Sequence, residues 1–277
     1  MLQLKAGMVH LKTEADIQLI KEGAQILGKA HGEVARLIKA GVKTSALDQV
    51  AETFIRDHGG VPSFKNYNGF PASLCISVNE VVVHGFPGDY ELKEDDIISI
   101  DCGVHYKGFH SDSAYTYPLP GAKEDVLQLL ERTYQSLHLG IAEAKPGNRI
   151  GDVSYAIQHF VEGFGYGVVR ELVGHGVGKS LHEDPEVPNY GKRGKGVKLV
   201  EGMVIAIEPM INAGARSIVQ ERDGWTIRTA DRKPSAHFEH TVAILKDGPE
   251  ILTTHKYIEE NYNYKWRSKS QLSKTEQ

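Results

Sequence analysis

Apolar residues recur at helical spacing near the start of the chain and predict two helices. Residues 14–39 carry apolar side chains three and four positions apart, with Thr13 as the expected N-cap and Gly41 as the stop. A shorter helix is predicted from about residue 45 to 57, and the Gly-Gly pair at 59–60 ends it. The chain is therefore expected to open with a long helix followed by a short one.

The same two-helix pattern returns at an offset of about 106 residues. Residues 123–144 form a second long helical segment, closed by Lys-Pro-Gly, and GDVSYAIQHFVEGFG supplies a short partner that ends at Gly163 or Gly165. Self-similarity over so long a period indicates an internal duplication and not a solenoid repeat, although glycine-capped helices also resemble one another by chance. The alignment matches Gly41 with Gly147, Lys43 with Arg149, Leu47 with Val153, Phe54 with Phe160, and Gly59 with Gly165.

The duplication extends into a strand with one further residue of shift. LKEDDIISID then lies over LVEGMVIAIE, so that Asp101 is matched with Glu208. Each segment is a short apolar run of the kind that forms a buried strand, and each ends in an acid. If the duplication is real, the two halves share one central sheet.

The predicted helices together with the predicted strands indicate an α+β fold. We expect one domain over residues 1–250, with repeats at about 13–117 and 123–245, and a polar C-terminal extension at 251–277 that is partly disordered. The expected strands are 73–83, 95–102, 109–117, 168–173, 203–211 and 236–245.

Composition narrows the class of partner. The 277 residues are 40% hydrophobic and 25% charged, with a net charge of −4, which favours neither nucleic acid nor a membrane surface as the main partner. The N-terminus lacks a continuous apolar stretch and no apolar run could span a bilayer, so we expect a cytoplasmic protein. Cys75 and Cys102 form no CxxC motif and are expected to be core residues.

Four acids stand where strands are predicted. Asp101 and Asp112 flank a turn and would face each other across an antiparallel pair, although an isolated pair of this kind more often caps a turn and meets solvent. Glu208 ends the apolar run MVIAIE, and Glu239 lies inside the half-buried pattern SAHFEHTVAIL. Because a buried acid is rare without a partner, the four together suggest a shared site.

An imidazole completes this set. His175 lies in GHGVG, where glycines allow close backbone approach and the side chain has no evident packing role. Four carboxylates and one imidazole form a ligand set for two divalent cations, whose charge of plus four would neutralise the acids. Oxygen-rich ligation with one nitrogen suits Mn(II), Fe(II), Co(II) or Zn(II), and the sequence does not choose among them.

The order and local strings of these residues resemble the type I methionine aminopeptidases, a peptidase family of the pita-bread fold, over about residues 10–250. The matching strings are NEVVVHGFP, IDCGVHYKGFHSDSA, GHGVGKSLHEDP, AIEPM and DGWTIRTADRKPSAHFEHT. The resemblance implies a metal-bridging hydroxide that hydrolyses the bond after an N-terminal methionine, with a small second residue preferred. It also implies that Asp101 chelates one metal, that Asp112 and Glu239 bridge both, and that His175 and Glu208 complete the other.

Further roles follow from the same resemblance. Glu208 would transfer the proton of the nucleophile, and His84 and His182 would contact the substrate, although each histidine alone could equally be structural. A monovalent cation, Na⁺ or K⁺, would bind near Asn79, Val81 and Ser235. The methionine pocket would be lined by Phe64, Tyr67, Phe70, Cys75 and Trp225, with Phe64 in place of a cysteine that is common in bacterial relatives.

Two other functions stay open from the sequence alone. One is a proline-directed peptidase of the same fold, although such enzymes usually carry a large N-terminal domain. The other is a non-catalytic peptide-binding relative, although these typically lose metal ligands and all five positions are present here. The expected partners are nascent polypeptide N-termini and the ribosome near the exit tunnel, and the expected state is a monomer.

Overall fold

The computed structural model describes residues 9–264. Thr13 caps the first helix as predicted: its hydroxyl accepts a hydrogen bond from the Asp16 N–H, and the Asp16 carboxylate accepts one from the Thr13 N–H. The helices are α1 (Glu14–Leu37), α2 (Thr44–Asp57), the 3-10 turn η1 (Tyr67–Gly69), α3 (Glu124–Glu143), α4 (Ile150–Glu162) and α5 (Lys256–Asn261).

The strands form antiparallel sheets. In the first half β4 (Ile97–Tyr106) pairs with β5 (Phe109–Pro118), β2 (Leu74–Val78) and β1 (Val61–Pro62). In the second half a five-stranded sheet has the order β15-β14-β9-β7-β8. The strands of that sheet are β7 (Gly174–Gly176), β8 (Glu183–Val187), β9 (Val204–Ile207), β14 (His240–Leu245) and β15 (Gly248–Ile251).

Two small sheets complete the topology. One has the order β13-β10-β6 and the other the order β11-β12-β3. Their strands are β3 (Val81–Val83), β6 (Gly167–Val168), β10 (Met210–Asn212), β11 (Ile218–Gln220), β12 (Ile227–Thr229) and β13 (Ser235–His237).

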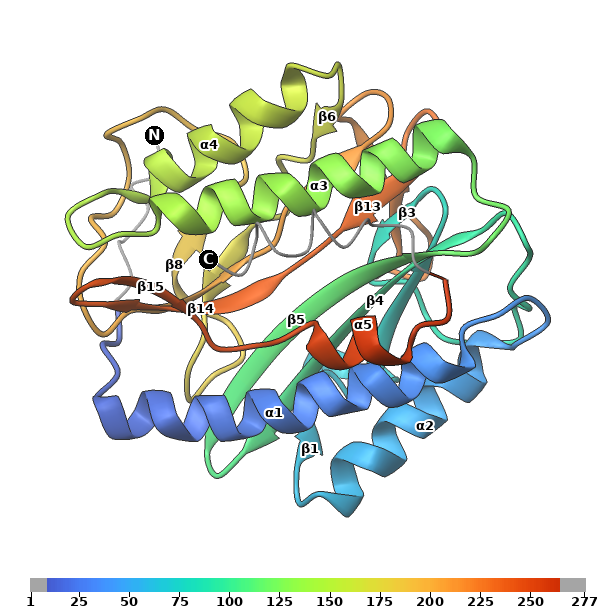
Figure 1. Cartoon of the computed structure of the whole chain (residues 1–277), viewed down its shortest axis with the longest axis horizontal. Helices are drawn as coiled ribbons and strands as arrows, with labels where there is room; N and C mark the ends of the chain where they lie inside the picture. Colours follow the sequence, from blue (N-terminus) through green and yellow to red (C-terminus); the bar gives the residue numbers. More distant parts are fainter. Residues whose placement is uncertain (1–8, 265–277) are drawn as a thin grey trace.

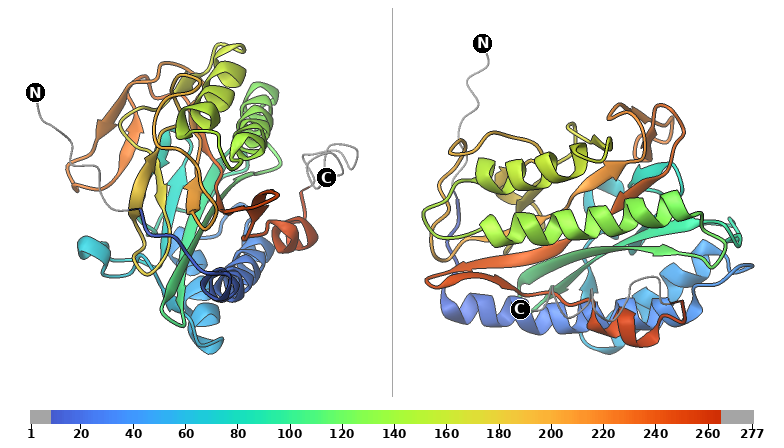
Figure 2. Two further views of the ribbon diagram at one scale, coloured as in Figure 1. Left: turned by 90° about the vertical axis from the view of Figure 1, so that its left-hand side faces the viewer. Right: turned by 45° about the horizontal axis from the view of Figure 1, so that its top comes forward.

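The helices lie in two pairs on opposite sides of the central strands. Helices α1 and α2 follow one side of the molecule and α3 and α4 the other, with β5, β13 and β14 running between them (Figure 1). A turned view shows the same separation (Figure 2). One core of buried apolar side chains draws on both halves, including Leu47 of α2 and its predicted counterpart Val153 of α4.

The two halves repeat the same backbone hydrogen bonds. The Gly41 N–H donates to the Leu92 carbonyl at 2.7 Å, and the Gly147 N–H donates to the Leu199 carbonyl at 2.9 Å. Isolated β-bridges join Lys43 to Glu91 and Arg149 to Lys198, which are again equivalent positions. These matched contacts support the internal repeat that the sequence predicts.

Several predicted strands are shorter or interrupted. The strand predicted at 73–83 divides into β2 and β3, because Asn79 adopts a left-handed conformation with a φ of 53°. The prediction for 203–211 divides at Glu208-Pro209, and that for 236–245 divides before His240. Only Gly167–Val168 forms at the predicted strand 168–173, and β1, β7, β8, β11, β12 and β15 had no predicted counterpart.

The chain continues to pack against α1 beyond residue 250. A side-chain carbon added at Gly28 or Gly32 of α1 would come within 2.9 Å of Thr254 or Tyr257, so helix α5 and the segment before it approach α1 closely. Ile258 is buried, and the Tyr262 hydroxyl donates to the carbonyl of Pro118. Residues 265–277 of the predicted polar extension lie outside the described residues.

Candidate metal centre

The hairpin of β4 and β5 places two acids on one face. Asp101 is paired with Ala114, and Asp112 is paired with Gly103, so the two carboxylates are diagonal neighbours across the strands. The turn itself is formed by Lys107 and Gly108, both with positive φ. The predicted proximity of Asp101 and Asp112 is therefore present, with an offset of two residues in the register.

The second half supplies the other members from short strands. Glu208 directly follows β9, Glu239 lies between β13 and β14, and His175 is the central residue of β7. A side-chain carbon at Gly174 or Gly176 would come within 2.4 Å of a backbone oxygen on β9 or β8. The glycines around His175 therefore allow the close backbone approach that the sequence indicated.

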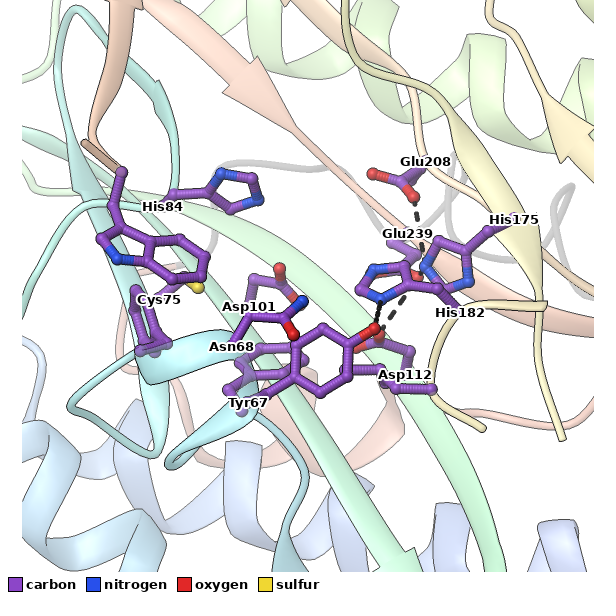
Figure 3. A pocket seen from close by; sticks show the side chains of 14 residues that line it. Tyr67, Asn68, Cys75, His84, Asp101, Asp112, His175, His182, Glu208 and Glu239 are labelled. Atoms are coloured by element: carbon purple, nitrogen blue, oxygen red, sulfur yellow. Dashed lines mark hydrogen bonds and ion pairs between the residues drawn. The ribbon is translucent and has the colours of Figure 1, made fainter. Parts of the chain in front are cut away.

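These five side chains face one cavity. One ligand atom each of Asp112, His175 and Glu239 lies within 4.8 Å of the others. His175 Nε2 is 3.6 Å from Glu208 Oε1 and 3.9 Å from Asp112 Oδ2, as the dashed lines in Figure 3 show. Asp101 lines the same cavity from the hairpin side.

Burial determines the electrostatics of the cluster. Asp112 is 3% exposed and Glu239 is 2% exposed. Burial raises the pKa of Asp101 to about 7 and that of Glu208 to about 8. Burial, followed by the neighbouring carboxylates, raises the pKa of Asp112 and Glu239 well above their usual range. Burial lowers the pKa of His175 to about 3, so this imidazole is neutral and able to ligate a metal.

The unpaired oxygens of the cluster fit divalent cations. Within residues 9–264, Oδ1 of Asp101, Oδ1 of Asp112 and Oε1 of Glu239 are buried without a hydrogen-bond partner. Three such atoms in one cavity would be costly unless a cation satisfied them. Hard oxygen donors with one neutral imidazole are suitable ligands for Mn(II), Fe(II), Co(II) or Zn(II).

A hydroxyl seam joins the ligand-bearing strands of the two halves. We use this term for Thr116 and Thr241 together with the backbone that they bridge. The Thr241 hydroxyl accepts from the Asp112 N–H at 3.0 Å and donates to the Asp112 carbonyl at 2.8 Å. The Thr116 hydroxyl makes the same two bonds to His237, at 3.0 and 2.7 Å. Between these two pairs of hydrogen bonds the Glu239 N–H donates to the carbonyl of Ala114 at 2.9 Å.

An aromatic pocket opens beside the acids. The cavity has a volume of about 220 Å³. Phe70 meets Trp225 edge-on with ring centroids 5.3 Å apart. The Tyr67 hydroxyl is 2.8 Å from His182 Nδ1 (Figure 3). All seven positions predicted to contact the substrate line this cavity, namely Phe64, Tyr67, Phe70, Cys75, His84, His182 and Trp225.

Three residues at the site were missed from the sequence. Asn68 and Leu181 line the cavity, and His237 Nε2 lies 3.7 Å from Glu208 Oε2. Asn68 belongs to a turn with positive φ at Asn66, Asn68 and Gly69, which the string KNYNG could have signalled. His237 precedes Glu239 by two residues, and the period of two in a strand places both on one face.

The residues predicted to bind a monovalent cation also lie together. The Ser235 N–H donates to the Asn79 carbonyl at 3.0 Å, and Val81 begins the strand that follows Asn79. Cation binding by Asn79, Val81 and Ser235 stays a prediction. Both cysteines are buried and unpaired; Cys102 belongs to the main core as expected, whereas Cys75 also lines the cavity.

The antiparallel sheets and the paired helices bring four acids and one imidazole together at a candidate metal centre. The chain belongs to metallopeptidase family M24, whose sequence profile matches residues 18–246. A methionine aminopeptidase from Clostridium perfringens is 52% identical over 246 residues, which are 89% of this chain and 99% of that protein. Methionine aminopeptidase 1 from Bacillus subtilis is 51% identical over the same shares of both chains.

Solved structures show the same fold. A methionine aminopeptidase from Thermotoga maritima matches with a TM-score of 0.88 and 42% identity, covering 89% of this chain and all of that one. A prolidase from Pyrococcus furiosus matches with a TM-score of 0.73 and 24% identity, covering 88% of this chain and 65% of that one, and shows the fold alone. The predicted pita-bread fold is confirmed. Helices that could cross a membrane are absent from residues 9–264.

Proposed function

We propose that this chain removes the initiator methionine from the N-termini of nascent proteins and peptides with the help of two divalent metal ions. The observation that carries the proposal is the placement of the five-residue ligand cluster beside an aromatic pocket. The names of relatives about 50% identical over nearly the full length of both chains support this substrate.

The pocket suits an unbranched thioether side chain. Phe64, Phe70 and Leu181 are buried apolar walls, and Trp225 presents its edge to Phe70. A methionine sulfur gains contacts at aromatic ring edges, and a flexible side chain can fill such an irregular space. Because Phe64 narrows the space that a smaller residue would leave open, branched apolar side chains should fit less well than methionine.

All five residues of the cluster would bind metal, and Glu208 would also transfer protons. Asp101, Asp112, His175, Glu208 and Glu239, which line one cavity, would hold the metal ions. When bound, the ions supply Lewis acidity that lowers the pKa of a water molecule and polarises the scissile carbonyl. Glu208, which lines the same cavity, would accept a proton from the attacking water and pass it to the leaving amine.

The two histidines outside the ligand set would orient the substrate. Burial lowers the pKa of His84 to about 4 and also lowers the pKa of His182, so both are neutral at pH 7. A neutral imidazole can donate one hydrogen bond to a peptide carbonyl and can accept another from an amide. The remaining parts of the proposal are a cytoplasmic monomer acting near the ribosome and a preference for a small second residue.

The test is cleavage of a Met-X-Ser peptide series under anaerobic conditions with Co(II), Mn(II), Fe(II) or Zn(II) added separately to metal-free protein. We expect release of free methionine that requires metal and is fastest with Gly or Ala at X. An Asp112→Ala, Glu239→Ala protein serves as the inactive control. Faster hydrolysis of Gly-Pro than of Met-Ala-Ser would favour a proline-directed peptidase, and metal binding without cleavage of either would favour a binding protein.

A further inference from the structure

His237 occupies a position at the metal centre that no assigned role explains. The residue ends β13, is 2% exposed and lies two positions before Glu239. Its Nε2 atom is 3.7 Å from Glu208 Oε2 and is buried without a hydrogen-bond partner among residues 9–264. A buried ring nitrogen that points at a carboxylate is costly unless the two groups interact.

The hydroxyl seam shows that this position is equivalent to that of Asp112. The Thr241 hydroxyl accepts a hydrogen bond from the N–H of Asp112 and donates one to its carbonyl. The Thr116 hydroxyl makes the same two hydrogen bonds to the backbone of His237. The hydrogen bond from the Glu239 N–H to the Ala114 carbonyl lies midway between these two pairs of hydrogen bonds along both strands. The internal symmetry that places a metal ligand at Asp112 in one half therefore places His237 in the other.

The two oxygens of Glu208 face different neighbours. Oε1 lies 3.6 Å from Nε2 of the ligand His175, and Oε2 lies 3.7 Å from Nε2 of His237. A carboxylate that ligates a metal through one oxygen is commonly oriented by a hydrogen bond to the other. The structure thus supplies a donor on the side of Glu208 that faces away from His175.

We propose that His237 is a positioning residue, whose Nε2–H donates a hydrogen bond to Oε2 of Glu208 and holds Oε1 towards the metal ions and the substrate. This requires the Nε2–H tautomer and a small side-chain movement, because 3.7 Å is longer than a hydrogen bond. Hydrogen bonds at active sites often shorten only in the productive complex. The inference rests on the proposed function, because it concerns the same metal centre.

The test compares two substitutions of one residue. His237→Leu removes the donor at similar volume, whereas His237→Gln keeps an N–H donor. We expect His237→Leu to lower kcat for Met-Ala-Ser by about 10–100-fold with KM changed less than about threefold, because orientation of Glu208 matters most in the transition state. We expect His237→Gln to retain kcat within about fivefold of the native protein.

A second readout does not depend on turnover. The visible absorption of Co(II) reports the geometry of its ligands, so His237→Leu should change the spectrum of the Co(II)-loaded protein and weaken Co(II) binding about tenfold, and His237→Gln should restore both. His31→Leu is the matched control, since His31 is also 2% exposed but does not line the cavity. It should leave the Co(II) spectrum unchanged.

The outcomes separate this inference from the proposed function. Native kcat and a native Co(II) spectrum in His237→Leu would overturn the role of His237. Failure of the native, metal-loaded protein to cleave Met-Ala-Ser would overturn the proposed function, while the Co(II) spectra would still test the hydrogen bond. If His237→Leu does not fold, His237→Met carries the same expectations.

Discussion

In the first half of the molecule the two acids stand on strands that run without interruption for ten residues each, whereas in the second half the chain breaks at each acid. Asp101 and Asp112 keep the strand geometry of β4 and β5. Glu208 follows β9 and precedes Pro209, and Glu239 lies between two short strands. The repeated unit therefore positions its acids by regular strand pairing in the first half and by irregular backbone in the second half.

The difference teaches where each half obtains its rigidity. A continuous hairpin fixes its side chains through ladder hydrogen bonds, so Asp101 and Asp112 need little outside support. The irregular half is held by distant contacts. Lys12, from the N-terminal segment, is 2.5 Å from Glu183 next to His182, and both side chains are nearly buried. Thr241 and Thr116 tie the interrupted strands to β5.

The largest predicted effect is a difference in kcat between variants of the equivalent acids Asp101 and Glu208. Asp101→Asn and Glu208→Gln each remove one carboxylate ligand, so each should weaken binding of one metal ion. Glu208→Gln should also lose proton transfer and lower kcat by a further 10²–10⁴-fold, on the order expected for a general acid–base residue. Metal content after dialysis and kcat at saturating metal measure the two effects. Equal kcat in the two variants would show that the repeat kept the roles equivalent.

Much of this site could be predicted because duplication leaves a trace in the sequence. Acids at the ends of matched strands, such as Asp101 and Glu208, are recognisable from apolar runs that end alike. The breaks were not predicted, because a short apolar run is equally consistent with a continuous strand. His237 was missed because a histidine in an apolar segment is usually structural, and its proximity to Glu208 arises from tertiary packing.

The next effect should show that the irregular half depends on outside support. Lys12→Met leaves Glu183 buried without its cation, and removal of one partner from a buried ion pair costs about 3–5 kcal/mol in the free energy of unfolding. Lys12→Met, Glu183→Gln should recover most of this loss, because no charge is left unpaired. Urea unfolding of the four proteins measures the coupling.

The first half offers the matched control. Lys43 and Asp89 also form an ion pair, but the side chains are 49% and 94% exposed. Lys43→Met should therefore change the free energy of unfolding by less than about 1 kcal/mol. A Lys12→Met protein as stable as Lys43→Met would show that the N-terminal segment does not support the irregular half.

The smallest predicted effect is a change in folding stability at acidic pH. It arises from equivalent positions in the helices of the two halves. His31 of α1 corresponds to Leu137 of α3, and both are buried. His31 Nε2 is 3.0 Å from the carbonyl of Ser113, next to Asp112, and burial lowers the pKa of His31 to about 4. Well above pH 6.5 the imidazole is neutral in both the folded and the unfolded chain and adds no pH dependence.

As the pH falls from about 6.5 towards 4, the unfolded chain binds a proton at this position and the folded chain does not, so stability decreases. The full difference approaches about 3 kcal/mol, since each pKa unit corresponds to about 1.4 kcal/mol. His31→Gln keeps a donor for Ser113 without this titration, so its free energy of unfolding should fall less steeply than that of the native protein. Urea unfolding of both metal-free proteins between pH 7.5 and about pH 4.5 measures the two slopes. Parallel slopes of the free energy of unfolding against pH would show that His31 contributes no more to the pH dependence of stability than Leu137, its counterpart in the second half.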